Sequence, residues 1–219
     1  ADWPFGLNKF IGDAHVPTKQ EIINILRGPL ALNCSESTVL FSLLNIRMAN
    51  DLILATEACG FKETQFIYIH KPWKRDLNLS GGFLHDITVG AFSFKNSDTK
   101  KNLNWPKFNT GLGGDKVELS ARSSLWTESH SEKIPRDEYG RPILKCPQPQ
   151  HLPTKVFNLC KHALDNDSYV VGIGDGQGWT SMAMLSILGA KAIVTEKDEI
   201  VFAYLGERVR RQVVILEHK

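Results

Sequence analysis

Apolar and polar positions divide the chain into three stretches with different rhythms. The first stretch, about residues 18–96, alternates between short helical and extended patterns. Thr18 is predicted to cap a short helix, with Glu21 as its capping-box partner. Residues 47–59 have a second helical rhythm, which Gly60 is well placed to end. Apolar runs at 38–44, 65–70 and 86–94 predict three strands.

The second stretch, residues 97–150, is polar, contains several glycines and prolines, and has little periodicity. We expect a long loop insertion at about 97–150 within a single domain that spans residues 1–219. Loops this long inside a compact domain are usually functional or disordered. Trp105 and Trp126 lie in this stretch, and either a partner anchor or packing back on the domain would explain them.

The third stretch, residues 153–219, alternates strands and helices. Apolar runs predict strands at 169–173, 192–195 and 213–217, and helical rhythms predict helices at 155–163, 180–188 and 199–208. Such an alternation predicts parallel strands with helices on both faces of the sheet. The predicted fold class is therefore α/β.

Composition and charge exclude several classes. The 219 residues carry 26 basic and 24 acidic side chains, a net charge of +2. This balance argues against nucleic-acid binding through bulk charge alone. No apolar run approaches the ~20 residues of a membrane span, so no membrane partner is expected. The four cysteines form no C-x-x-C pair and have no histidine cluster beside them, so we expect no metal site and a reducing compartment.

A glycine-rich loop carries the clearest local chemistry. Glycine recurs at Gly172, Gly174, Gly176 and Gly178, directly before Trp179 and at the junction of a predicted strand and helix. Glycine lets a backbone approach a ligand closely, and a helix N-terminus presents unpaired N–H groups. Glu196 ends the next predicted strand, where a carboxylate is placed to bind ribose hydroxyls. The pair predicts an adenosine-containing ligand.

The spacing of these glycines separates the candidate ligands. It is G-x-G-x-G, and Gln177 stands where the third glycine of a dinucleotide fingerprint is expected. The spacing therefore disfavours NAD and a nucleotide-binding oxidoreductase. S-adenosylmethionine is the better candidate, because it has ribose and adenine but no pyrophosphate. A tight strand-to-helix turn without any ligand is the competing interpretation.

The order of the elements also favours S-adenosylmethionine as the ligand. The glycine-rich loop comes after the three predicted strands of the first stretch, as in a circularly permuted methyltransferase. The start of the chain, Ala1-Asp2-Trp3-Pro4-Phe5, resembles an Asp-Pro-Pro-Trp catalytic motif with Trp3 in place of the first proline. In this the sequence resembles the β-class amino methyltransferases. It is most similar to the eukaryotic family that makes 6-methyladenine in messenger RNA and, in ciliates, in DNA.

Other segments resemble motifs of the same family in the same order along the chain. They are Arg47 after a strand, Cys59-Gly60-Phe61, Lys71 at a strand end, Val89-Gly90, His151-Leu152-Pro153-Thr154-Lys155 before the cofactor strand, and Gly176 to Thr180. The resemblance implies a Rossmann-like, S-adenosylmethionine-dependent methyltransferase fold in permuted β-class order. A sheet of this class has seven strands and the pattern predicts six. The missing strand is expected before Asp2, in a longer protein.

The resemblance also implies roles for the degenerate catalytic motif. Asp2 and the carbonyl after it would orient the amine of a target adenine, and Phe5 would stack on the base. Trp3 beside Pro4 departs from the motif, and Gly172-Ile173-Gly174 replaces the family's Asp-Pro-Phe. These departures favour a non-catalytic subunit, paired as a heterodimer with a catalytic methyltransferase subunit that binds S-adenosylmethionine. A catalytically active adenine methyltransferase is the competing hypothesis.

A candidate nucleic-acid segment interleaves basic and aromatic side chains at Lys71, Trp73, Lys74 and Arg75. This combination suits single-stranded nucleic acid, and an ordinary surface loop explains it nearly as well. The C-terminal half looks closer to the DNA-modifying branch of the family, so DNA is favoured over RNA. A DNA substrate implies a place in the nucleus.

Overall fold

The computed structural model describes residues 15–28, 34–70, 87–104, 108–110, 117–119, 124–127, 136–141, 151–160, 169–173, 191–195, 203, 206 and 207. The helices are α1 (Lys19–Arg27), the one-turn 3-10 helix η2 (Ile46–Met48), α2 (Ala49–Ala58), α3 (Ser97–Lys101) and α4 (His151–Cys160). The strands are β1 (Val39–Leu44), β2 (Glu63–His70), β3 (Ile87–Phe94), β4 (Phe108–Thr110), β5 (Val117–Leu119), β6 (Leu125–Thr127), β7 (Tyr169–Ile173) and β8 (Lys191–Thr195).

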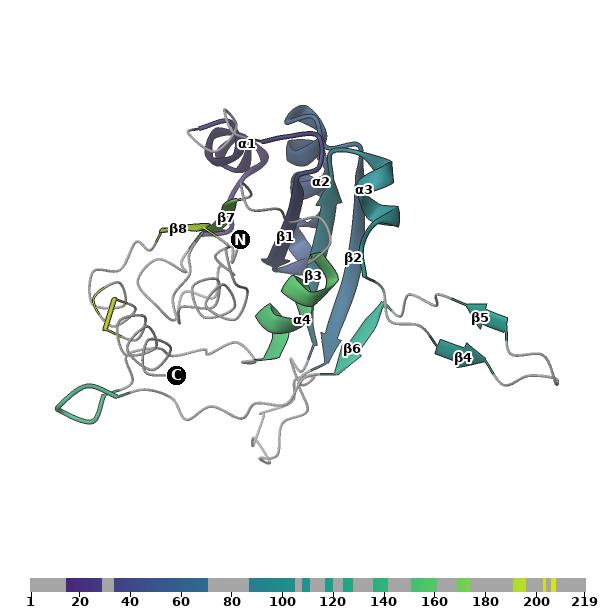
Figure 1. Ribbon diagram of the computed structural model, residues 1–219. Coiled ribbons are helices and arrows are strands. Elements are labelled where there is room, and N and C mark those ends of the chain that lie inside the picture. Colours follow the sequence, from purple (N-terminus) through teal and green to yellow (C-terminus); the bar gives the residue numbers. More distant parts are fainter. Residues whose placement is uncertain are drawn as a thin grey trace, which may run out of the picture.

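The largest sheet has the strand order β1-β3-β2-β6. Strand β3 is antiparallel to both of its neighbours, so β1 and β2 run in the same direction on either side of it. The short edge strand β6 is parallel to β2. Strands β7 and β8 form a separate parallel pair, and β4 and β5 form a separate antiparallel one. Figure 1 shows this mixed sheet beside the β7–β8 pair.

Helices cover both faces of the four-stranded sheet (Figure 1). On one face α1 and α2 bury a cluster that includes Ile22, Leu52 and Ala91. On the other face α4 and the end of α3 bury a second cluster, which includes Leu152, Phe92 and Ile69. The strands alternate between the two clusters because successive side chains point to opposite faces. The sheet is therefore the middle layer of a three-layer arrangement, which confirms the predicted α/β class.

The predicted start of α1 is confirmed in detail. Thr18 accepts a hydrogen bond from the backbone N–H of Glu21, and the Glu21 carboxylate accepts one from the Thr18 N–H at 2.8 Å. This is the reciprocal capping box that the spacing indicates. The end of α2 is also confirmed, because Gly60 follows it with a φ of 84°. Arg27 of α1 adds a hydrogen bond to the Ala58 carbonyl at 2.6 Å, which ties the two helices together.

The central strand β3 explains one glycine of the resemblance. At Gly90 a Cβ would lie 2.9 Å from the Ile67 side chain and 3.2 Å from Phe41. Both neighbours come from the flanking strands. Their side chains can approach the β3 backbone this closely only because residue 90 has no side chain. The strands at 38–44, 65–70 and 86–94 are confirmed to within two residues at each end.

The stretch expected to be a long loop insertion, about residues 97–150, includes short helices and strands. This stretch contains α3, β4, β5 and β6, and β6 joins the main sheet beside β2. Trp126 in β6 is only 7% exposed and packs against Phe92, so it packs back on the domain. The elements were missed because each is three to five residues long, too short to establish a period.

One predicted boundary in the third stretch also changes. Helix α4 begins at His151, although its rhythm was expected to start only at residue 155. Pro153 is compatible with this earlier start, because the first turn of a helix does not use its N–H groups for intrahelical hydrogen bonds. Residues 203, 206 and 207 are helical, as expected for 199–208. The helix predicted at 180–188 and the strand at 213–217 lie outside the described residues.

Candidate cofactor site

The segments predicted to bind a cofactor follow the two strands of the parallel pair β7–β8. Gly172 pairs with Val194, and Ile173 pairs with Thr195, so the two strands end side by side. The glycine loop follows Ile173 directly in the sequence, and Glu196 follows Thr195. Ligands of α/β proteins bind beyond the carboxyl ends of parallel strands. The register therefore starts both candidate ligand-binding segments from the same edge of the pair.

Strand β7 has a glycine at its last-but-one position. Gly172 is buried between β-branched neighbours of the sequence Val-Val-Gly-Ile. It presents no side chain at the end of the strand, so only backbone groups can meet a ligand there. Close approach of an adenosine-type cofactor is compatible with this position, but a carboxylate contact from residue 172 is not.

All the other predicted site residues lie outside the described residues. These are the catalytic motif Asp2, Trp3, Pro4 and Phe5, the cofactor residues Gly174, Gly176, Gly178, Trp179 and Glu196, and the nucleic-acid residues Lys71, Trp73, Lys74 and Arg75. The described strands nevertheless fix where two of these groups begin. The placement of these residues and the contacts of their side chains stay predictions.

The carboxyl ends of β1 and β2 lie at one edge of the main sheet. Leu44 at the end of β1 pairs with Val89, and His70 at the end of β2 pairs with Ile87. Because β1 and β2 are parallel, the segment 71–75 starts from the edge at which β1 ends. The positively charged segment predicted to hold nucleic acid therefore begins at the ligand edge of an α/β sheet.

The turn after β1 places a further cation at this edge. Asn45 accepts a hydrogen bond from the Arg47 backbone N–H at 3.0 Å and caps η2. Arg47 is exposed, and its neighbour Ile46 is 58% exposed. Sequence reasoning found Arg47 only through the family resemblance and did not rank it as a site residue. An arginine three positions after the end of an apolar run was the available signal in the sequence.

Helix α4 carries the segment that resembles the family's His-x-x-x-Lys motif. Leu152 and Val156 pack into the sheet. Lys155, on the exposed side, lies over the Trp126 ring with its Nζ 4.7 Å from the centroid. This cation–π contact joins α4 to β6. Helix α4 thereby has a defined position on the sheet, a few residues before the cofactor strand β7.

Other chemistries find little support in the described part of the chain. Burial raises the pKa of the Cys160 thiol to about 12, so it stays protonated and is a poor nucleophile. No group of three His, Cys, Asp or Glu side chains is arranged to hold a metal ion among the residues that the structure describes. Within the same residues, no helix has the length and apolar character needed to cross a membrane.

Comparisons with known proteins agree with this geometry at the level of the fold. No family model and no curated protein matches the sequence. Solved structures do match, at low sequence identity. The crystal structure of the M1.HpyAVI–SAM complex has a TM-score of 0.57 and 15% identity, covering 94% of this chain and 86% of that one.

Two further structures match over similar lengths. PvuII DNA methyltransferase, described as cytosine-N4-specific, has a TM-score of 0.58 and 18% identity, covering 96% of this chain and 82% of that one. A proposed DNA modification methylase from Thermus thermophilus, complexed with S-adenosyl-L-methionine, has a TM-score of 0.54 and 14% identity, covering 89% and 76%. The chain therefore has the Rossmann-like fold of S-adenosylmethionine-dependent DNA methyltransferases, in permuted β-class order.

Proposed function

We propose that the chain is the non-catalytic, methyltransferase-like subunit of a heteromeric complex that makes 6-methyladenine in DNA. In this complex it scaffolds a catalytic subunit and helps to hold the nucleic acid, and its place of action is the nucleus. The fold shared with DNA methyltransferases supports the reaction class. The observation that carries the non-catalytic role is the glycine at position 172.

Gly172 stands where the resembled family has the aspartate of its Asp-Pro-Phe sequence. In the structure it is a buried strand residue paired with Val194, close to the end of β7. A carboxylate at this point would be aimed at the cofactor from the strand end, and glycine removes it. Trp3 also removes the φ restriction of the first proline in the catalytic motif. Both changes weaken the binding and positioning on which methyl transfer depends.

A catalytically active enzyme is the second candidate, favoured by what the motif retains. Asp2 keeps the acidic side chain, and Phe5 keeps an aromatic ring for stacking on an unstacked base. The carbonyl after Asp2 belongs to the backbone, so replacing proline with tryptophan leaves it in place. Glu196 directly after β8 also keeps a carboxylate for the ribose.

Calorimetric titration with S-adenosylmethionine separates the two candidates. The purified chain alone is expected to give no saturable heat of binding. The complex that co-purifies with it is expected to bind one equivalent for each catalytic subunit. Tight, stoichiometric binding by the isolated chain would refute the non-catalytic role.

A methyl-transfer assay on the assembled complex provides an independent test. Asp2→Ala is expected to leave turnover on adenine-containing DNA unchanged, because the catalytic carboxylate belongs to the partner. Asp98→Ala serves as a matched control, since Asp98 is an exposed carboxylate on α3 that pairs with Lys101. Size-exclusion chromatography checks that both complexes stay assembled. Loss of turnover in Asp2→Ala alone would establish the active enzyme instead.

A further inference from the structure

Residues 136–141 form a closed turn that the proposed function does not use. The Asp137 N–H donates to the Arg141 carbonyl at 2.9 Å, and the Gly140 N–H donates to the Asp137 carbonyl at 3.0 Å. Gly140 has a φ of 75°, a left-handed conformation that glycine adopts without strain. Arg136 donates to the Gly140 carbonyl, which fixes the outer side of the turn.

The Asp137 carboxylate holds the turn from inside. It accepts hydrogen bonds from the backbone N–H groups of Tyr139 at 3.0 Å and Arg141 at 2.8 Å, and from Arg141 Nε at 2.8 Å. Desolvation raises the pKa of this carboxyl, but the hydrogen bonds and charge of Arg141, together with the hydrogen bond from the Tyr139 N–H, outweigh it, and the pKa is lowered. The Asp137 carboxylate is therefore ionised, and hydrogen bonds within residues 136–141 hold the shape of the turn.

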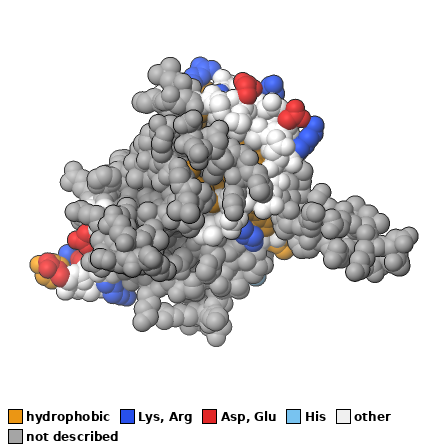
Figure 2. Space-filling view, viewed as in Figure 1, with side chains coloured by type: hydrophobic (Ala, Val, Ile, Leu, Met, Phe, Trp, Pro, Cys, Tyr) orange, Lys and Arg blue, Asp and Glu red, His pale blue; other side chains and the backbone are white. Residues whose placement is uncertain are grey.

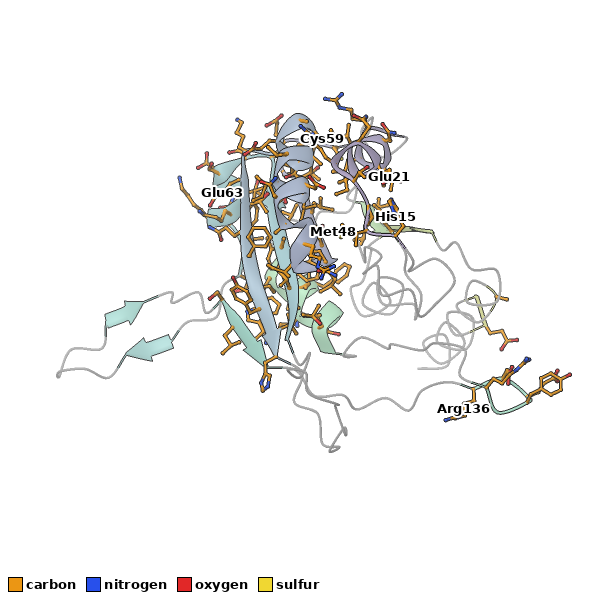
Figure 3. The ribbon with its side chains drawn as sticks, turned by 180° about the vertical axis from the view of Figure 1, so that it is seen from behind. His15, Glu21, Met48, Cys59, Glu63 and Arg136 are labelled. Carbon is orange, nitrogen blue, oxygen red and sulfur yellow. The ribbon has the colours of Figure 1, made fainter. Side chains whose placement is uncertain are left out.

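This turn presents an aromatic ring to the solvent. Tyr139 is 73% exposed, the highest value among the large apolar side chains that the structure describes. The Arg141 guanidinium carbon lies 5.0 Å from the ring centroid, so a cation supports one side of the ring. Figures 1 and 3 show the turn, which includes the labelled Arg136, at the periphery and away from the main sheet. Tyr139 contributes little to the core.

The charges of the turn indicate which ligand it fits. Arg136 and Arg141 are balanced by Asp137 and Glu138, and Arg141 is already engaged by Asp137. The turn therefore offers little net attraction to a phosphate. What remains is a rigid aromatic face, and such faces stack on unpaired bases whatever their sequence. A guanidinium on the opposite side of the ring extends the same stack.

We propose that Tyr139 is a stacking platform for an unpaired base of the nucleic acid. The partner class rests on the proposed function, which supplies a nucleic-acid substrate whose target base is unstacked. The interaction is one of ring on ring, so its free energy is independent of salt. This separates it from contacts made by basic side chains, which release counterions and weaken as salt rises.

Fluorescence anisotropy with a labelled, mixed-sequence single-stranded DNA oligonucleotide tests the proposal on the full chain. Tyr139→Ala is expected to weaken binding by roughly 5- to 150-fold, the range for loss of one stacked base. Tyr139→Trp is expected to bind at least as tightly as the original chain. The slope of log Kd against log salt concentration should be the same for all three proteins.

Tyr68→Ala is the matched control, because Tyr68 is a tyrosine of β2 that is 44% exposed on another surface. It should leave the Kd unchanged. An unchanged Kd in Tyr139→Ala, a changed salt slope, or no measurable binding by the original chain would overturn the proposal. Release of the partner subunit by Tyr139→Ala with an unaltered Kd would show a protein-docking turn instead. S-adenosylmethionine titration is independent of Tyr139, so failure of the proposed function is detected separately.

Discussion

At the scale of single residues, two buried serines of the main sheet differ in the hydrogen bonding of their hydroxyl groups. Ser42 in β1 is fully buried, and its Oγ has no hydrogen-bond partner in the described structure. Ser93 in β3 is equally buried, but its Oγ lies 2.8 Å from that of Thr64 and joins a hydroxyl chain with Thr56. A buried hydroxyl without a partner keeps its desolvation cost, whereas a paired one offsets it.

Ser42→Ala is therefore expected to stabilise the protein by about 1 kcal/mol, because it removes an unsatisfied polar group. Ser93→Ala is the control of the same size and chemistry. It is expected to destabilise by about 1 kcal/mol, since it takes a partner from Thr64. Urea unfolding at constant m-value measures both. Equal effects of the same sign would show that Ser42 is in fact satisfied in solution.

The sequence predicts only some of these single-residue features. Ser42 sits inside the apolar run 38–44, and nothing in the pattern shows that its hydroxyl lacks a partner. Gly90 could be recognised as a family residue, but its reason, the approach of Ile67 and Phe41, appears only in three dimensions. Contacts between strands distant in sequence have no local signal, whereas the cap at Thr18 does.

At the scale of elements, the capping box of α1 predicts a pH dependence. The Thr18 N–H, the His15 ring and the Thr18 hydroxyl donate hydrogen bonds to Glu21 and lower its pKa to about 2, from 4.5. Since the folded-state pKa is the lower one, the stabilisation is fully present above pH 4.5. It is lost as the pH falls from 4.5 towards 2.

Thermal unfolding across this pH range provides the measurement. Glu21→Gln is expected to lower the melting temperature at pH 7, and the difference from the original chain should shrink below pH 4.5 and disappear near pH 2. In a Thr18→Ala background the same substitution should have a smaller effect, because the Thr18 hydroxyl no longer donates to the Glu21 carboxylate, although the backbone N–H of residue 18 still does. A difference that does not change with pH would contradict the ionised capping box.

The edge strand β6 predicts that part of the stretch 97–150 belongs to the core. Trp126→Ala is expected to destabilise the protein by about 3 to 5 kcal/mol, because it empties a site packed by Phe92 and Lys155. Trp126→Phe keeps an aromatic ring and should lose less. Leu125→Ala, at a neighbouring position that is 56% exposed, should change stability by no more than about 0.5 kcal/mol. Similar urea midpoints for all variants would mean that β6 does not pack in solution.

Element prediction succeeded where the periodic segments were long. The strands of the first stretch and α1 were recognisable because six or more residues repeat one pattern. Strand β6 was not, because its three residues follow no period and its pairing with β2 is a tertiary contact. For the candidate site, the sequence could indicate the two segments that follow β7 and β8. Only the structure shows that β7 and β8 pair in parallel and end side by side.

At the scale of the whole molecule, positive and negative side chains are mixed. Figure 2 shows Lys and Arg interleaved with Asp and Glu on the described part of the visible face. Lys100 pairs with Glu63 at 2.7 Å, and Lys101 pairs with Asp98 at 2.7 Å. Together with a net charge of +2, this arrangement predicts weak electrostatic attraction to DNA.

The isolated chain is therefore expected to show a shallow salt dependence with double-stranded DNA. The slope of log K against log salt concentration should be smaller in magnitude than about 3, because few phosphates are neutralised. The proposed complex should have a steeper slope, because in that proposal the catalytic subunit supplies additional positive charge. Anisotropy titrations at salt concentrations from about 50 to 200 mM measure the slopes of the chain and of the complex. A steep slope for the chain alone would place the main DNA-binding surface on this subunit.

The antiparallel position of β3 has a consequence for synthesis of the chain. Strands β1 and β2 emerge first, but each pairs with β3 and they do not pair with each other. The apolar strand β1 therefore stays unpaired during synthesis until β3 is complete at residue 94. Synthesis of the residues between the two strands takes several seconds at about 5–20 residues per second. During that interval its edges are open to other nascent chains. Slowed translation between β2 and β3 should then increase aggregation without altering the finished fold.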